Sequence, residues 1–162
     1  MGNGALEILK FNLEHLAASL NWLRRSFDIC VKIGLKAEYQ EDEFDQFENL
    51  TSRYARTTDL LINKVLRSID AVELVDSGSV IDAANHAEKR GIVDSVSQLR
   101  DLKDLRNEIA HEYETEDLSK LFALVLDTVP RLFVLADRTV NYCGKYTGKP
   151  SLPNLIFSRD QS

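Results

Sequence analysis

A regular seam of apolar residues near the N-terminus constrains the fold of this chain more than any other feature. Its members are spaced alternately three and four residues apart and are Leu6, Leu9, Leu13, Leu16, Leu20, Leu23, Phe27 and Cys30. That spacing places them on one narrow stripe of an α-helix. We therefore predict a helix over residues 5–33, ended by Gly34. Such a stripe must be covered by other helices, in the same chain or in a partner.

Four further segments also show helical periodicity. The acidic stretch 36–46 suits the first turn of a second helix, which we expect to run to about Val72. Its expected buried face is Phe44, Phe47, Leu50, Tyr54, Leu61, Val65 and Ile69. A short third helix is predicted to begin at a capping box formed by Ser79 and Asp82 and to end at Gly91.

Two longer helices complete the expected fold, over about 94–113 and 116–143. Thr115 is a plausible N-cap for the last of them, and Pro130 is expected to kink it because proline lacks the amide that would bond to Leu126. The fourth helix is expected to bury Val96, Leu99, Leu102, Leu105 and Ile109. Long helices joined by short loops predict an all-α, antiparallel four- to five-helix bundle.

The length of 162 residues favours a single domain. We assign residues 1–146 to the bundle and residues 147–162, which contain Pro150 and Pro153, to an extended C-terminal tail. With 44% apolar and 28% charged residues, the composition is typical of a soluble globular domain. The tail also carries apolar residues that could dock on the bundle or on a partner.

Several functional classes are disfavoured by the composition. The net charge of −6 argues against a protein that coats DNA. Cys30 and Cys143 are far apart and have no metal-ligand spacing, so we expect no disulfide, no metal and no cofactor. The first ten residues lack a signal-peptide pattern, and no apolar run is long enough to span a membrane. The sequence therefore predicts a cytoplasmic protein without a membrane partner.

One stretch of the fourth helix combines side chains that could perform acid–base chemistry on a phosphate. Asn107 and His111 are four residues apart and share one helical face, whereas Arg106 and Tyr113 share a neighbouring face. A guanidinium can hold a phosphate, a histidine can give or take a proton near neutral pH, and an amide can orient either. These are the groups needed to cleave a phosphodiester without a metal.

Structural interpretations of the same residues remain open. Arg106 could pair with Glu108 or Asp104, and His111 could simply end its helix. His15 and His86 are interpreted as surface or boundary residues, and Trp22 as a core or interface residue rather than a base-stacking platform.

Acidic residues surround the stretch, so attraction of a phosphate would need basic residues from elsewhere. The candidates are the pairs Arg53–Arg56 and Lys89–Arg90. Solvated helix faces, paired with Glu48, Asp59 or Glu88, are the simpler explanation of both pairs.

The pattern Arg-x-x-x-x-His-x-Tyr resembles the signature of the HEPN superfamily in its HepT-type toxin form. It is written here as Arg106-Asn107-Glu108-Ile109-Ala110-His111-Glu112-Tyr113. The polar residue directly after the arginine matches the family pattern, and a small helical bundle of this length is similar too. The resemblance covers eight residues.

The resemblance implies a helical homodimer in which two copies of the motif meet in a composite site. Many such proteins are metal-independent endoribonucleases that use the RNA 2′-hydroxyl as the nucleophile. Carried over, Arg106 and His111 would be catalytic, Asn107 would orient or bind, and Tyr113 would be the site of AMP addition. The partner implied is a minimal nucleotidyltransferase that acts as the antitoxin.

Two other functions stay open. Some members of the superfamily resemble non-catalytic binding partners, so this chain could be the substrate-binding subunit of a minimal nucleotidyltransferase. A purely structural helical adaptor is the third hypothesis.

Overall fold

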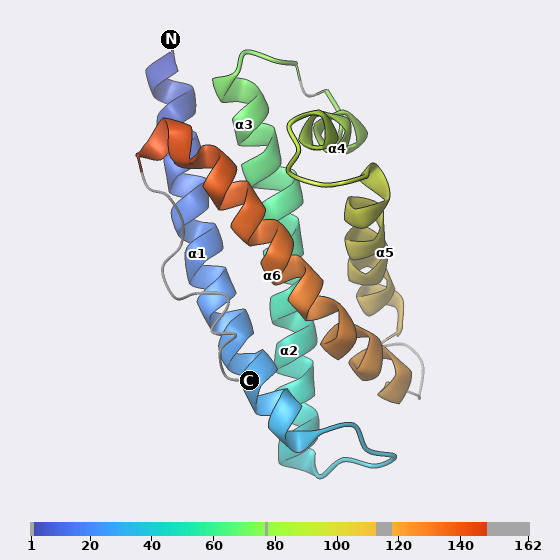
Figure 1. Ribbon diagram of the computed structural model, residues 1–162. Helices are drawn as coiled ribbons and strands as arrows, with labels where there is room; N and C mark the ends of the chain where they lie inside the picture. Colours follow the sequence, from blue (N-terminus) through green and yellow to red (C-terminus); the bar gives the residue numbers. More distant parts are fainter. Residues whose placement is uncertain (1, 77, 113–117, 149–162) are drawn as a thin grey trace.

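The computed structural model describes residues 2–76, 78–112 and 118–148, which form an all-α helical bundle (Figure 1). The elements, in chain order, are α1 (Gly2–Ile33), α2 (Glu41–Asp59), the π-helical turn η1 (Leu60–Val65), α3 (Leu66–Val72), α4 (Val80–Lys89), α5 (Val96–Glu112) and α6 (Ser119–Thr147). The predicted fold class is confirmed.

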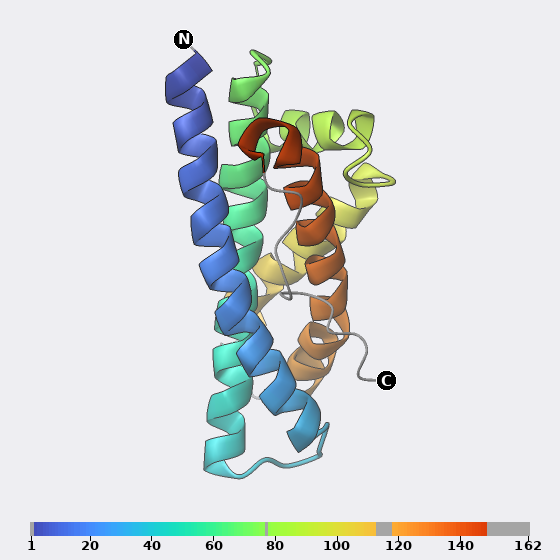
Figure 2. The ribbon, with the colours of Figure 1, turned by 60° about the vertical axis from the view of Figure 1, so that its left-hand side comes forward.

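Consecutive long helices run antiparallel to one another. In Figure 1, α1 descends, the continuous rod α2–η1–α3 ascends beside it, α5 descends, and α6 ascends across the bundle. The short helix α4 lies across the top, between α3 and α5, as Figure 2 also shows. The core therefore lies between the α1/α2–α3 pair and the α5/α6 pair.

The predicted apolar seam of α1 forms part of this core. Leu9, Leu16, Leu20, Leu23 and Cys30 are completely buried, and the other three members are half-buried against the same cluster. The helix ends as expected, because Gly34 takes a positive φ of 77° that favours glycine. The seam is covered within the chain, mainly by α2–η1–α3 and α6.

The second predicted helix contains a feature that periodicity did not reveal. The rod from α2 to α3 is continuous and starts with three acids in its first turn, Glu41, Asp42 and Glu43. Between Leu60 and Val65, however, it widens into a π-helical turn. A π-turn inserts one extra residue into an α-helix, so the side chains beyond it are rotated relative to an unbroken helix.

The ends of the remaining helices agree with the sequence where they are described. Ser79 caps α4, its hydroxyl accepting from the Asp82 amide, and Gly91 follows the helix with φ 79°. The helix α6 continues through Pro130 to Thr147, beyond the predicted end at 143. The proposed cap Thr115 and most of the predicted tail lie outside the described residues.

A polar network joins α3, α4 and α6 at one end of the bundle. The Asp70 carboxylate is fully buried and lies 2.7 Å from Arg90 and 3.1 Å from the His86 ring. Arg90 also donates to Glu73, which accepts from the hydroxyls of Tyr142 and Tyr146 on α6. Buried carboxylates are tolerated only with such partners, so the network fixes how the three helices meet. Arg90 therefore has a structural role.

Because of this network, the free energy of unfolding decreases as the pH falls into the acid range. Burial alone would raise the pKa of Glu73, but hydrogen bonds from Tyr142, Tyr146 and Arg90 outweigh it and lower that pKa below its ordinary value. A lowered carboxyl pKa adds stability above the ordinary value of 4.5, which is lost as pH falls through the folded pKa. We expect the free energy of unfolding of Glu73→Gln to fall less steeply between pH 5 and pH 3 than that of the wild type, as measured by urea unfolding from pH 3 to 7. The same steepness in both proteins would contradict the prediction.

None of the described helices combines the length and the apolarity that a membrane crossing requires.

Candidate functional site

The candidate site residues lie on the last turns of α5. Leu105 and Ile109 are buried and anchor this end of the helix in the core. Residues on either side of that buried stripe therefore project into two different grooves. Tyr113, the fourth candidate, lies outside the described residues.

Arg106 faces the groove between α2 and α5. The groove is lined by Glu48, Asn49, Thr51, Ser52, Ala55, Arg106, Ile109 and Ala110. The Arg106 guanidinium donates to both carboxylate oxygens of Asp59, at 2.8 and 3.0 Å. The sequence had suggested Glu108 or Asp104 as its partner. Asp59 accepts from Nε and Nη2 of the Arg106 guanidinium, and the N–H groups on its other side remain as donors for a ligand.

His111 faces the groove between α5 and α6. It is exposed and lines this groove together with Asn107, as their spacing of four residues predicted. The far wall comes from α6 and includes Leu124, Thr128 and Arg131. Three carboxylates also line the groove, those of Asp101, Asp104 and Glu108. The imidazole is thus accessible to a substrate, but its surroundings are acidic.

Arg106 and His111 of one chain do not meet. Five residues separate them, which is about 140° around an α-helix, and they line different grooves. A single chain therefore pairs Asn107 with His111 and leaves Arg106 on the other side of α5. Only contact between two copies could bring an Arg106 next to a His111.

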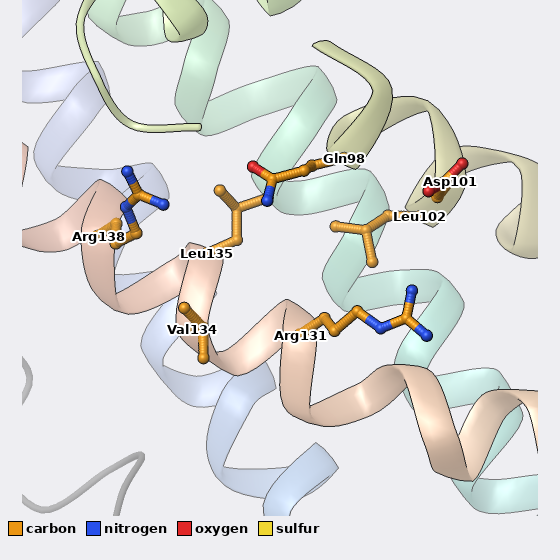
Figure 3. A pocket seen from close by; sticks show the side chains of 7 residues that line it. All are labelled: Gln98, Asp101, Leu102, Arg131, Val134, Leu135 and Arg138. Atoms are coloured by element: carbon orange, nitrogen blue, oxygen red, sulfur yellow. The ribbon is translucent and has the colours of Figure 1, made fainter. Parts of the chain in front are cut away.

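Arg131 is a basic residue of the His111 groove that the sequence analysis missed. It lies on α6, is largely exposed, and forms an ion pair with Asp127 one turn away. Figure 3 shows the neighbouring part of the groove, where Leu102 faces Val134 and Leu135 between Arg131 and Arg138. In the sequence Arg131 is one charge on a polar helix face, and only the packing of α6 on α5 places it beside the motif.

The other titratable candidates have local roles. His86 contacts buried Asp70, whereas His15 is exposed with its ring 4.2 Å from that of Phe11. Burial raises the pKa of both Cys30 and Cys143 to about 12, so neither thiol is ionised at neutral pH. A cysteine nucleophile is therefore disfavoured.

In the part of the chain that the structure describes, no three His, Cys, Asp or Glu side chains gather closely enough to hold a metal ion.

Comparison with family models, curated proteins and solved structures finds no match to this chain.

Proposed function

We propose that this protein is a HEPN-type toxin, a metal-independent endoribonuclease whose site is completed across a homodimer. The observation that carries the proposal is the exposed imidazole of His111 on the same groove wall as Asn107, at the motif end of α5. The separation of Arg106 from His111 within one chain supports the composite arrangement, because only a second copy can bring an Arg106 to this groove.

In the proposed reaction, His111 takes the proton from the RNA 2′-hydroxyl. The 2′-oxygen then forms a bond to phosphorus, the bond to the 5′-oxygen breaks, and that oxygen receives a proton from an acid in the site. Arg106 of the second copy would stabilise the charge on the phosphoryl oxygens, and Asn107 would orient the imidazole or the substrate. The products would be a 2′,3′-cyclic phosphate and a free 5′-hydroxyl.

The charges around the two grooves include some that oppose and some that favour phosphate binding. The three carboxylates around His111 repel a phosphate, whereas Arg131 attracts it. Asp59 neutralises Arg106 but also fixes the direction of its guanidinium, which lowers the entropy lost when it binds a phosphate.

The direct test is digestion of RNA by the purified protein in excess chelator. We expect cleavage that continues in chelator and leaves cyclic-phosphate ends. Failure to cleave any single-stranded RNA, or cleavage only after a divalent metal is restored, would reject the proposal.

A second candidate is a non-catalytic binding partner of a minimal nucleotidyltransferase. The paired Arg106 and the acidic groove around His111 favour it, because both reduce affinity for a phosphate. It predicts a stable complex with such an enzyme and no RNA cleavage. Expression of the chain with and without the enzyme separates the two, since growth arrest by the chain alone favours the toxin. AMP addition at Tyr113, detected by mass spectrometry, would be compatible with either.

A further inference from the structure

Two aromatic side chains on α1 are exposed although the helix buries its seam. Phe11 and Trp22 are 55% and 54% exposed, and they lie on the side of α1 away from the fully buried seam residues. The bond between Ser19 and Thr57 shows that this side adjoins α2. The two rings are about 16 Å apart along the helix, from its rise per residue.

The rod α2–η1 places cations beside these rings. The Arg53 guanidinium lies 5.0 Å from the centre of the Trp22 ring and donates to Ser26. Arg56, one turn further along α2, is exposed on the same side. Arg25 is exposed one turn beyond Trp22 on α1. The sequence had suggested no such interleaving, because the aromatic and basic residues come from different helices.

The π-turn aligns a further cation with Arg56. Lys64 is exposed and lies eight residues after Arg56, a spacing that in a regular α-helix would place it about 80° around the helix from Arg56 and nearly in line with Arg53. The π-turn inserts one extra residue, so Lys64 returns to the angular position of a residue two α-turns from Arg56. The bonds Asn12–Ser68 and Ser19–Thr57 fix the register of α1 against the antiparallel rod and place Lys64 between the levels of Phe11 and Trp22.

These cations have no acidic partners in the described part of the chain. The ion pairs among the described residues of the bundle join other side chains, and none reaches Arg25, Arg53, Arg56 or Lys64. Two exposed carboxylates of α1, Glu7 and Glu14, flank Phe11 one turn to either side, so the cations gather at the Trp22 end of this side. A chain of net charge −6 thus has a local cationic surface around its only tryptophan.

We propose that this surface, the Trp22 face (Phe11, Trp22, Arg25, Arg53, Arg56 and Lys64), binds single-stranded RNA. Exposed aromatic rings beside cations that track a phosphate backbone are the combination that single-strand binding needs. The inference rests on the proposed function, since it names the surface that holds the substrate. Asn49 and Ser52 of α2 line the Arg106 groove and adjoin Arg53 and Arg56, so the RNA can pass from the face into that groove.

The test uses a 2′-O-methyl oligoribonucleotide, which has no free 2′-hydroxyl and cannot be cleaved by the proposed route. Titration into the full-length protein is expected to quench the fluorescence of Trp22, the only tryptophan, as a base stacks on its ring. In fluorescence anisotropy with a labelled probe, Trp22→Ala and Arg56→Ala are each expected to weaken binding about tenfold. Loss of Arg56 is also expected to reduce the salt dependence of binding.

The control is Arg100→Ala, which removes an exposed cation from α5 without touching the face. No quenching, or equal affinities for Trp22→Ala, Arg100→Ala and wild type, would overturn the inference even if RNA is cleaved. If the probe binds through the Trp22 face but ordinary RNA is not cleaved, the proposed nuclease activity is wrong and the inference that this face binds RNA stands. If Trp22→Ala instead converts a dimer to a monomer in sedimentation, with probe affinity per chain unchanged, the face is a contact between copies and the inference is wrong.

Discussion

Replacing Arg90 by alanine is expected to lower the free energy of unfolding by about 3–5 kcal/mol. The change leaves the fully buried Asp70 carboxylate with the His86 ring as its remaining side-chain partner in the described part of the chain. Removing one member of a buried ion pair costs this much because the other charge stays desolvated and unpaired. Arg90 also donates to Glu73, whose bonds from two tyrosines remain.

Urea unfolding followed by circular dichroism measures this effect. Lys89→Ala is the matched control, because Lys89 is the exposed neighbour of Arg90 on the same helix and its loss is expected to change stability by less than about 0.5 kcal/mol. The double variant Asp70→Asn/Arg90→Ala is expected to recover part of the loss, since the unpaired charge is gone. A loss below about 1 kcal/mol for Arg90→Ala would show that the network does not hold α3, α4 and α6 together.

Replacing His111 by alanine is expected to reduce RNA cleavage about a hundredfold to ten-thousandfold, the usual contribution of a general acid–base group. Because the side chain is exposed and lines a groove, its loss is expected to leave the melting temperature nearly unchanged. Single-turnover cleavage of a labelled RNA in chelator measures the effect. Arg100→Ala is the control, since it removes an exposed charge from the same helix more than two turns away. Full activity in His111→Ala would exclude this groove as the site.

A mixing experiment tests the composite arrangement itself. Co-expression of His111→Ala with Arg106→Ala gives mixed dimers that combine an intact His111 from one copy with an intact Arg106 from the other. Because the two residues of one chain line different grooves, we expect these dimers to regain cleavage that neither variant shows alone. Mixed dimers that stay inactive would contradict a site shared between copies.

Much of the fold follows from local patterns in the sequence. The three–four spacing of the α1 seam, the Ser79–Asp82 capping box and the positive φ of Gly34 are determined by residues near one another in the chain. The pairing of Asn107 with His111 on one groove wall is likewise local, because it depends only on helical periodicity. The π-turn between Leu60 and Val65 was not predicted, since one inserted residue leaves the apolar spacing of the helix nearly intact.

What the sequence determined by itself was therefore the helices, the sides on which they bury their apolar residues, and the local order of the motif. Tertiary packing alone decided that Arg106 pairs with Asp59, that Arg131 joins the His111 groove, and that the cations of α2 lie beside Trp22 of α1. The physical reason is range. Helical periodicity fixes neighbours within a few turns, whereas these contacts join residues 20 to 47 positions apart, brought together only by how the apolar faces of different helices pack.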